Sequence, residues 1–426
     1  MSDRPLKVLH VCDHLGWEGS RMHGVKRLFA WMLPRFDPAL VKPALISLRR
    51  RDLSEETLDA LGVDITYLQR GKFDPATLTD LMKEIERRRI DVLHLHGYGA
   101  TTFGRLAAKF TRLPVVLHEH ANLTATPWFQ QIADRLLAGT TDIALAVSES
   151  TAEFVRGPRK VPAERVKVVY LGAPLEEFSR VRSADEIAAT RQELGLAPDD
   201  FAVGTVTRLH DSKGNEFLVA AARDVIAARP EARFVLVGEG PLLDDLKAQA
   251  HALGLGDRFR FHGFHKDTAA VLSAFDLSVF PSLWEGTPLT AFEALAAGKP
   301  IVSTDADGLL DILEDGVTAW VVSKRDAASL ARAIVHAIDH PQEREAKARA
   351  AREAGRGYDI AAFVRKMERL YALLHETSRA THRKGALQAD LSFLDTRTAR
   401  PSASGRHRIV EVQTGVFERY PAGRVK

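Results

Sequence analysis

Two glutamates, Glu285 and Glu293, are separated by seven residues and follow an apolar run at residues 277–280. We expect this run to be a strand, with Glu285 in the loop after it and Glu293 on the helix that comes next. Side chains on a helix lean toward its N-terminus, so both carboxylates can face one ligand placed above the loop. Carboxylates accept hydrogen bonds from hydroxyl groups, which suits a polyhydroxylated ligand such as a sugar nucleotide.

The start of that helix is an expected phosphate site. Thr287 occupies the position of an N-cap, Pro288 the first helical position, and Gly298 is placed to end the helix. The free N–H groups of Gly286, Thr287 and Leu289 would attract phosphate, because the helix dipole adds to their partial positive charge. The plain alternative is an ordinary helix start with two surface acids.

Two cations follow another expected strand, at residues 202–207. Arg208 and Lys213 lie in the loop between this strand and an expected helix at residues 215–228. Arginine supplies forked donors and lysine a mobile point charge, and together they suit a diphosphate. A leaving diphosphate gains negative charge, so both side chains would stabilise the transition state more than the ground state. A surface loop with two ordinary cations is the alternative.

The segment from Glu285 to Glu293, Glu-Gly-Thr-Pro-Leu-Thr-Ala-Phe-Glu, resembles the two-glutamate motif of retaining glycosyltransferases, above all those of family 4. The stretch from Arg208 to Lys213 and its following glycine is similar to the Arg-Leu…Lys-Gly pattern of the same family. The resemblance implies that Glu293 holds the ribose hydroxyls and that Glu285 addresses the transferred sugar. It also implies that Arg208 and Lys213 bind the donor phosphates without a metal.

A glycine-rich turn follows the expected strand at residues 233–237. Gly238 and Gly240 open the pattern of a dinucleotide-binding loop, but its third glycine position holds Leu243, so a dehydrogenase is a distant alternative. In the resembled family this turn borders the donor pocket, which makes Gly238 a donor-binding candidate. Phe264 lies in the loop where that family contacts the base, with simple packing at a strand end as the alternative.

The first half of the chain offers histidines. His118 and His120 close an expected strand at residues 114–118 and face the same way, because they are two residues apart. We expect no metal there, since no third ligand is apparent nearby. The resemblance to Glu-His-Asn segments of family 4 implies that His120 faces the sugar. His118 would then lie behind His120 without contacting the sugar. His96, which with His94 ends the preceding strand, is a candidate for the acceptor side.

The loop at residues 14–25 is rich in glycine, and Gly24 stands at the start of an expected helix, where backbone N–H groups can meet phosphate. Family 4 proteins usually carry a Gly-Gly pair here. This chain has His23-Gly24, so Gly24 alone keeps a donor-contact role. Trp17 and Arg21 either gate the acceptor or simply order the loop.

Two further patterns have ordinary alternatives. Asp305-Ala-Asp307 has the form of the metal-binding Asp-x-Asp motif of another glycosyltransferase fold, but we interpret it as a loop and helix start and predict no metal. The resemblance also implies that a member acting on a lipid carrier has a basic, apolar patch on its first domain. The residues that could form it, or that are merely a solvated helix face, are Phe103, Arg105, Lys109, Phe110 and Arg112.

Short apolar runs alternate with amphipathic segments twice along the chain, which predicts an α/β fold with two Rossmann-like, doubly wound domains. We place the first at residues 1–174 and the second at residues 201–357, with a polar linker at residues 175–200. The resemblance implies the GT-B fold over roughly residues 6–375, with a cleft between an acceptor-side first domain and a donor-binding second domain. In that fold a C-terminal helix, here residues 358–376, crosses back onto the first domain.

The expected strands of the first domain are residues 7–12, 43–47, 64–68, 91–96, 114–118, 143–148 and 165–171. Those of the second domain are residues 202–207, 233–237, 259–262, 277–280, 301–303 and 319–322.

The composition is that of a soluble globular protein: 426 residues, enough for two domains, with 45% hydrophobic and 27% charged residues. A net charge of +3 argues neither for nor against a polyanionic partner, and we expect no nucleic acid. The single cysteine, Cys12, fits a reducing compartment. Neither a signal peptide nor a membrane-spanning run is apparent, so we expect a cytoplasmic protein whose membrane contact, if any, is peripheral at the inner face.

Residues 377–426 differ in character, with ten Lys or Arg against four Asp or Glu. We interpret them as a basic, solvated tail of unknown structure. Contact with anionic lipid or polymer is one alternative. Docking of its apolar residues on the body is another; these include Leu387, Leu391, Phe393 and Leu394.

These residues and the resemblance together predict a glycosyltransferase, which we expect to act in polysaccharide biosynthesis. The resemblance alone implies that it retains the anomeric configuration and needs no metal. The expected donor is a nucleotide-diphosphate sugar, a UDP-sugar rather than a GDP-sugar, and the acceptor hydroxyl belongs to a glycan, a lipid-linked saccharide or a small molecule. No cofactor is expected. The alternatives are a non-catalytic sugar-nucleotide-binding partner protein and a GT-B-fold sugar-nucleotide epimerase, which would turn over the donor alone.

Overall fold

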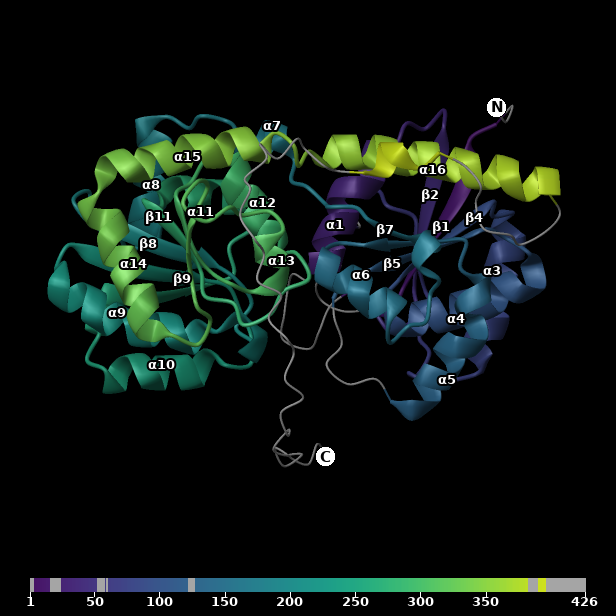
Figure 1. Cartoon of the computed structure of the whole chain (residues 1–426), viewed down its shortest axis with the longest axis horizontal. Coiled ribbons are helices and arrows are strands. Elements are labelled where there is room, and N and C mark those ends of the chain that lie inside the picture. The colour runs from purple at the N-terminus through teal and green to yellow at the C-terminus, as the bar shows by residue number, and fades with distance from the viewer. Residues whose placement is uncertain are drawn as a thin grey trace. The chain divides into compact units, whose positions relative to one another are not determined.

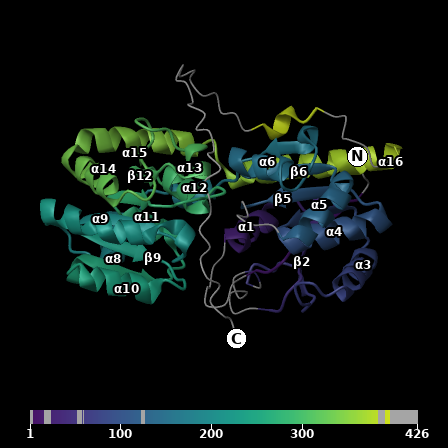
Figure 2. The same ribbon diagram turned by 60° about the horizontal axis from the view of Figure 1, so that its bottom comes forward.

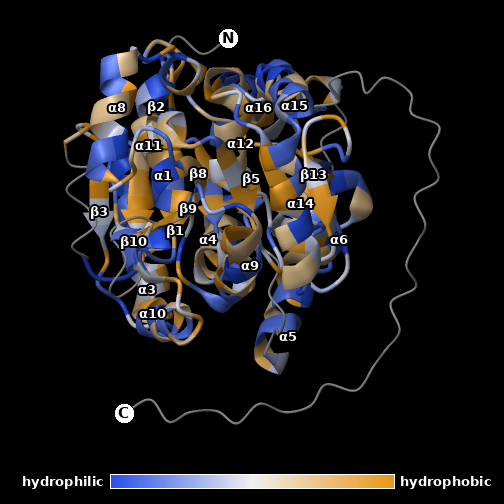
Figure 3. Ribbon diagram, turned by 90° about the vertical axis from the view of Figure 1, so that its left-hand side faces the viewer, coloured by the Kyte–Doolittle hydropathy of each residue, from blue (hydrophilic) through white to orange (hydrophobic). Residues whose placement is uncertain are grey.

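Two parallel sheets, each covered by helices on both faces, carry the fold (Figure 1). The computed structural model describes residues 4–15, 24–51, 58, 60–121, 127–381 and 390–395. Most of the strands are buried on both faces, which is why they are continuous apolar runs in the sequence. Hydrophobic residues accordingly gather along the central strands, while the surrounding helices carry residues of both kinds (Figure 3).

The first domain, residues 4–174, has a seven-stranded sheet in the order β3-β2-β1-β4-β5-β6-β7. Its strands are β1 (Leu6–Cys12), β2 (Val41–Ser47), β3 (Ile65–Tyr67), β4 (Val92–His96), β5 (Val115–Glu119), β6 (Ile143–Ala146) and β7 (Val166–Val168). Its main helices are α1 (Gly24–Met32), α3 (Ala76–Arg88), α4 (Tyr98–Thr111), α5 (Trp128–Leu137) and α6 (Glu149–Arg156).

The second domain, residues 201–357, has a six-stranded sheet in the order β10-β9-β8-β11-β12-β13. Its strands are β8 (Phe201–Val206), β9 (Ala232–Val237), β10 (Phe259–Gly263), β11 (Leu277–Phe280), β12 (Ile301–Thr304) and β13 (Trp320–Val322). Its helices are η5 (Asp211–Lys213), α9 (Asn215–Ala228), α10 (Leu243–Ala252), α11 (Thr268–Ala274), α12 (Leu289–Ala296), α13 (Asp307–Leu310), α14 (Ala327–Asp339) and α15 (Pro341–Gly355). In both sheets the strand order reverses beside the first strand, which is where parallel α/β sheets bind ligands.

The segment expected to be a polar linker, residues 175–200, is largely helical. It contains α7 (Leu175–Phe178) and α8 (Ala184–Glu193). A capping box starts α8: the Ser183 hydroxyl accepts from the Glu186 N–H at 3.2 Å, and the Glu186 carboxylate accepts from the Ser183 N–H at 2.8 Å. Because α8 packs against α11, this segment is part of the second domain's structure.

The C-terminal helix α16 (Ile360–Thr381) returns to the first domain, as expected (Figures 1 and 2). It packs against α1, β1 and β4, and it buries Phe363, Met367 and Tyr371. The first sheet therefore has α1 and α16 on one face, while α4 covers the other. Both domains and α16 belong to one compact unit, residues 1–396.

Part of the expected tail lies against this unit. Residues 390–395 are described, and they contain the short helix η7 (Ser392–Leu394). Leu391 and Leu394 are buried in the hydrophobic core, which supports the docking alternative for these residues. Leu387 and residues 396–426 lie outside the described part. Among the helices that the structure describes, none combines the length and apolar character needed to cross a membrane.

Candidate active site

The loops after β8, β9, β10 and β11 hold the second domain's candidate residues. Since the carboxyl ends of parallel strands share one edge of a sheet, these loops meet above that edge. The Leu283 N–H donates to the Ser212 carbonyl at 2.8 Å, which joins the loop after β11 to η5. This edge therefore brings Glu285 next to Arg208 and Lys213, although Glu285 lies 72 residues after Lys213 in the sequence.

Lys213 and Glu285 form a half-buried ion pair in this loop cluster. The Lys213 ammonium donates to the two oxygens of the Glu285 carboxylate at 2.5 and 2.6 Å. The Ser282 hydroxyl donates to one of these oxygens at 2.7 Å. The Glu285 side chain is 8% exposed, so Lys213 supplies the charge that makes its burial tolerable.

Arg208 lies beside this pair. Burial lowers the pKa of the Arg208 guanidinium, and the charge of Glu285 opposes that shift. The Arg208 Nε is buried and has no hydrogen-bond partner among the described residues. A buried cation with an unused donor, next to a lysine, is an arrangement that suits an anion.

The glycines after β9 are required by close backbone contacts. Gly238 has a φ of +145°, and a Cβ there would lie 1.8 Å from the Thr207 carbonyl oxygen. The Gly238 N–H donates to the Gly263 carbonyl at 2.7 Å, so this turn adjoins the loop that carries Phe264. Gly238 and Phe264 thus border the same end of the sheet.

Glu293, on α12, is fully buried. Its carboxylate lies 2.9 Å from the Arg27 guanidinium, which comes from α1 of the first domain. Burial raises the pKa of Glu293 to about 7, although Arg27 lowers it. Glu293 and Glu285 therefore have different counter-ions, one from each domain.

The start of α12 differs from the expectation. The helix begins at Leu289, with Pro288 at the N-cap position, so the predicted roles of Thr287 and Pro288 are each displaced by one residue. The Thr287 hydroxyl does not cap the helix; it donates to the Val147 carbonyl of the first domain at 2.6 Å and to the Gly286 carbonyl at 2.8 Å. This tertiary contact overrides the local capping preference.

The same loop touches His120. A Cβ on Gly286 would lie 2.3 Å from the His120 carbonyl oxygen, so the backbones of the two domains are in close contact here. The backbone of His120 is thus adjacent to the loop of Glu285; that its side chain faces the same ligand stays a prediction. At the other end of α12, Gly298 has a φ of +62° directly after the C-cap, as expected of a helix-ending glycine.

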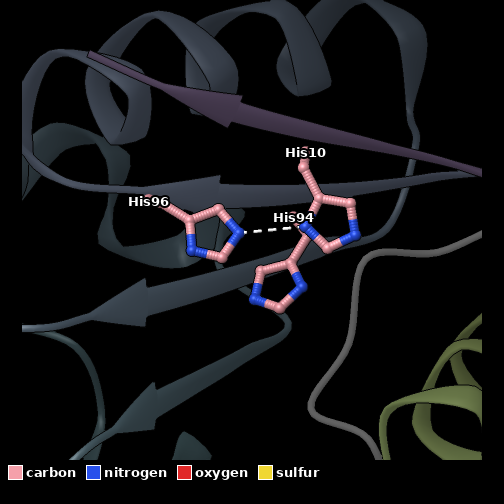
Figure 4. Close-up of side chains that lie close together, drawn as sticks. All are labelled: His10, His94 and His96. Atoms are coloured by element: carbon pink, nitrogen blue, oxygen red, sulfur yellow. Dashed lines mark hydrogen bonds between the residues drawn. The ribbon is translucent and has the colours of Figure 1, made fainter. Parts of the chain in front are cut away.

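Five histidines, four from β1, β4 and β5 and His120 directly after β5, form two hydrogen-bonded rows on one face of the first sheet. In the first row, His10 Nδ1 lies 3.0 Å from His96 Nε2, and His96 Nδ1 lies 2.9 Å from His120 Nε2. Figure 4 shows His10 and His96 joined in this way, with His94 beside them. The second row joins Tyr371, His94 and His118 at 2.6 and 3.2 Å; Tyr371 comes from α16.

The expectation that no third ligand lies near His118 and His120 is wrong. His96 has a ligand atom within 4.8 Å of theirs, and His10, His94 and His96 form a similar set. Strand register brings them together, since His96 pairs with His118 and His10 with His94. The ring planes are inclined by only 14–42°, so their in-plane lone pairs run side by side and do not converge on one point. The rings fit hydrogen bonding better than a shared metal ion.

These histidines are neutral. Burial lowers the pKa of His10 and of His120 to about 3, and it lowers the pKa of His94, His96 and His118 well below 6.5. A neutral imidazole has one donor and one acceptor nitrogen. His120 can therefore hydrogen-bond a hydroxyl while its other nitrogen is held by His96.

The remaining predicted residues are more peripheral. Gly24 is the first residue of α1 and is exposed, with open space around it. Trp17, Arg21 and His23 lie outside the described residues. Asp305 and Asp307 form a loop and helix start as interpreted, with the Asp305 carboxylate accepting from the Lys324 N–H at 2.8 Å.

Arg105 is not part of an exposed basic face. Its guanidinium is fully buried and donates to Asp134. Arg159 extends this buried cluster by donating to Glu119 and to Thr101. Phe110 and Lys109 are exposed as expected, but the charge of Arg105 neutralises an internal acid.

Sequence reasoning missed Arg27, Ser282 and the histidine rows. An arginine on an amphipathic helix and a serine in a loop give no local signal, because their partners are set by tertiary structure. The histidines were visible individually, but their register was not.

Two protein-family models match the chain. The model of Glycosyltransferase Family 4 matches residues 24–177, and that of Glycosyl transferases group 1 matches residues 186–354. The chain belongs to glycosyltransferase family 4. Together the two matches cover most of both domains, and the residues gathered above lie within them.

Curated relatives of this glycosyltransferase are 25–30% identical to it over the aligned residues. The UDP-Gal:alpha-D-GlcNAc-diphosphoundecaprenol alpha-1,3-galactosyltransferase of Escherichia coli is 25% identical over 70% of this chain and 79% of its own length. The 2-deoxystreptamine N-acetyl-D-glucosaminyltransferase of Streptomyces fradiae is 30% identical over 59% of this chain and 63% of its own length.

Solved structures show the same fold. HepE of Anabaena, in complex with UDP and glucose, has a TM-score of 0.75 and 21% identity, covering 86% of this chain and 99% of its own. WaaG, a glycosyltransferase involved in lipopolysaccharide biosynthesis, has a TM-score of 0.65 and 14% identity, covering 85% and 99%. Each of the two sheets of this family 4 enzyme, with its helices, therefore forms one of the two domains of a GT-B glycosyltransferase.

Proposed function

We propose that this glycosyltransferase moves a sugar from a nucleotide-diphosphate sugar to an acceptor hydroxyl, with retention of anomeric configuration and without a metal. One observation carries the proposal: Arg208, Lys213 and Glu285 meet at the ligand-binding edge of the second sheet, against His120 of the first domain. Two cations supply the charge that a diphosphate leaving group needs.

The Lys213–Glu285 pair favours one orientation of the bound donor, with its diphosphate at Lys213 and its sugar at Glu285. A diphosphate competes with Glu285 for the Lys213 ammonium, and Arg208 offers forked donors to the same group. Once Lys213 turns toward the diphosphate, Glu285 is free to accept hydrogen bonds from the sugar hydroxyls. As the bond between the sugar and the diphosphate breaks, the leaving group gains charge, and the two cations stabilise it increasingly.

Glu293 and His120 complete the proposed donor site. Glu293 accepts from the ribose hydroxyls, and neutral His120 hydrogen-bonds the transferred sugar from the first domain. We also assign donor contacts to the helix N-terminus at Gly24 of the first domain and to the second-domain residues Gly238, Phe264, Gly286, Thr287, Pro288 and Leu289. Contact between the domains at Gly286 and His120 excludes water, so that transfer is favoured over hydrolysis.

A UDP-sugar is the proposed donor. HepE is described in complexes with UDP and with UDP-glucose, and the name of the E. coli relative specifies UDP-Gal. Both proteins are at most 25% identical to this chain. They therefore support a UDP-sugar as the class of donor, and we propose no particular sugar.

Calorimetric titration of UDP-, GDP- and ADP-glucose into the wild type and Glu293→Ala tests the donor site. We expect one nucleotide to bind the wild type and to bind the variant at least tenfold more weakly, while Glu345→Ala, on an exposed part of α15, behaves as wild type. Binding of none of them by the wild type would contradict the proposal.

Turnover measurements distinguish the proposed glycosyltransferase from the two alternatives, an epimerase and a non-catalytic binding protein. An epimerase converts the donor without an acceptor, and a non-catalytic binding protein leaves donor and acceptor unchanged. For the proposed transferase, NMR of the product should show the donor's anomeric configuration, and excess EDTA should leave the rate unchanged.

The acceptor is proposed to be a lipid-linked saccharide, because α5 presents an apolar surface. Trp128 and Leu136 are 73% and 74% exposed, and the Phe73 ring packs edge-on to Phe129 at 5.4 Å. Exposed Arg135 adds a positive charge that anionic lipid attracts. The E. coli relative's name also specifies a diphosphoundecaprenol-linked acceptor.

Cosedimentation with vesicles of phosphatidylglycerol and phosphatidylcholine tests this surface. Trp128→Ser with Leu136→Ser should reduce the bound fraction severalfold, since each exposed apolar side chain contributes by burial in the lipid. Val181→Ser removes an apolar side chain that is 82% exposed elsewhere and should have no effect. Equal binding of all three proteins would contradict a role for α5.

A further inference from the structure

Arg27 is contributed by the first domain to a site in the second. Its guanidinium nitrogen Nη1 lies 2.9 Å from Glu293 Oε1, and its other terminal nitrogen, Nη2, donates to the hydroxyl of Thr268, the first residue of α11. The guanidinium also lies 5.0 Å from the ring centre of Trp31, and the side chain is only 15% exposed. Arg27 is thus held in place on three sides.

Glu293 has unused capacity to accept hydrogen bonds. Its side chain is fully buried, and its partners among the described residues are the Arg27 guanidinium, in an ion pair, and the Thr268 hydroxyl, which leaves acceptor positions open on both carboxylate oxygens. A carboxylate has about four acceptor positions, and the ion pair occupies one oxygen only. A buried acceptor left open in this way is suited to a ligand that brings two hydroxyl groups.

The charge of Glu293 depends on its neighbours. Arg27 of α1 and the Thr268 hydroxyl of α11 lower the pKa of Glu293, while Glu177 of α7 and burial raise it. The pKa of the Glu177 carboxyl is itself raised, chiefly by its surroundings' partial desolvation. Removing Arg27 would leave a buried carboxyl next to another acid, and such a group takes up a proton.

We propose that Arg27 is a positioning residue for the donor: by favouring the charged form of the Glu293 carboxylate and orienting it, Arg27 allows that carboxylate to accept both vicinal hydroxyls of the donor ribose. This rests on the proposed function, in which Glu293 binds the ribose. Because Arg27 belongs to the first domain, the ribose site in the second domain is complete only when α1 lies against α12. Donor binding and contact between the domains are therefore coupled.

Calorimetric titration of UDP from pH 6 to pH 9 tests this role. We expect Arg27→Gln to weaken UDP binding at least tenfold at pH 7, with a smaller loss at pH 9, where Glu293 ionises without help. Arg27→Lys restores the charge and should recover most of the affinity. Arg35→Gln is the matched control, because Arg35 pairs with Glu176 and is not paired with Glu293; it should bind UDP as the wild type does.

A ligand without the diol gives a second, independent comparison. For 2′,3′-dideoxy-UDP the wild type and Arg27→Gln should bind equally, since no ribose hydroxyl is present to use Glu293. In a Glu293→Gln background, Arg27→Gln should cause no further loss of UDP affinity. This double-variant comparison keeps the test valid even where one single variant melts at a lower temperature.

Three results would overturn the inference. Arg27→Gln could bind UDP like the wild type across the pH range, or it could lose UDP and dideoxy-UDP equally, which would indicate a phosphate contact or a structural role. In either case the proposed donor site would stand. A wild type that binds no nucleotide would overturn the donor site and this inference together.

Discussion

At the scale of single residues, the ion pair of Lys213 and Glu285 links the two halves of the proposed chemistry. The cation that would hold the diphosphate and the acid that would hold the sugar neutralise each other in the ligand-free chain, 2.5 Å apart. Replacing either one leaves a half-buried charge without its partner. The pair therefore matters for stability as well as for binding.

Lys213→Ala should reduce kcat/KM at least tenfold. Loss of a hydrogen bond to a charged group is worth about 1.5–3 kcal/mol, and about 1.4 kcal/mol corresponds to a factor of ten in rate. Steady-state kinetics with the donor identified above measures the change, and Lys247→Ala, on the exposed side of α10, is the control. A loss of less than twofold would exclude Lys213 from the diphosphate site.

Gly238→Ala should destabilise the fold by more than about 2 kcal/mol, because its Cβ would overlap the Thr207 carbonyl in addition to adopting a positive φ. Gly254→Ala separates the two causes. Gly254 has a φ of +67° with no atom within 4 Å of the added Cβ, so it should lose only about 1 kcal/mol. Urea denaturation measures both; equal losses would mean that steric contact at Gly238 is unimportant.

At the scale of elements, apolar runs were sufficient to locate the strands. The runs expected at residues 277–280 and 233–237 correspond to β11 (Leu277–Phe280) and β9 (Ala232–Val237), because strands buried on both faces need little else. The helix expected at residues 215–228 is α9 (Asn215–Ala228). These signals are local, so one sequence reveals them.

Features that depend on contacts between distant segments could not be predicted in the same way. Thr287 has the character of an N-cap but bonds to Val147, 140 residues away in the chain. The linker expected at residues 175–200 carried a local signal that was overlooked, the Ser183–Glu186 capping box. Arg27 had none, since its partner is on the other domain.

The histidine rows likewise combine a local signal, which the sequence reveals, with contacts between distant segments, which it does not. Both His-x-His patterns were apparent, and for His118 and His120 so was the fact that the two side chains face the same way. Their stacking depends on the register of β4 with β5 and on Tyr371 of α16, neither of which the sequence specifies. The error about a third neighbouring histidine follows directly from that missing register.

At the scale of the whole molecule, the buried histidines make stability depend on pH. His10 and His120 have pKa values of about 3 in the folded chain and near 6.5 when exposed, so the unfolded chain binds more protons between these values. Each such histidine lowers the free energy of unfolding by about 1.4 kcal/mol per pH unit as the pH falls from 6.5 toward 3. Glu293, with a raised pKa of about 7, increases the free energy of unfolding as the pH falls from 7 to 4.5. This single group opposes the five buried histidines, whose combined effect is larger.

Urea denaturation at pH 7, 6 and 5 should therefore show a steep loss of stability toward low pH. His10→Asn keeps a donor near His96 but does not titrate, so it should reduce the slope by about 1.4 kcal/mol per pH unit below pH 6. His251→Asn, at an exposed site on α10, should leave the slope unchanged. Equal slopes for His10→Asn and the wild type would mean that His10 is charged in the folded chain.

Removing α16 should unfold the first domain. A chain ending at residue 357 loses Phe363, Met367 and Tyr371, and burial of each contributes about 1.5–3 kcal/mol, a large part of the 5–15 kcal/mol typical of a whole fold. Calorimetry should find no cooperative transition for the first domain in that chain, while a chain ending at residue 396 should melt normally. A cooperative first-domain transition in the shorter chain would show that α16 is dispensable.

The return of α16 also sets an order of events during synthesis. The first domain's last strand, β7, leaves the ribosome about 200 residues before α16 is complete, which at about 5–20 residues per second is roughly 10–40 s. Throughout that interval the sheet face that carries the histidine rows has no cover from α16. The nascent first domain can therefore complete its core only after the end of the chain has been made.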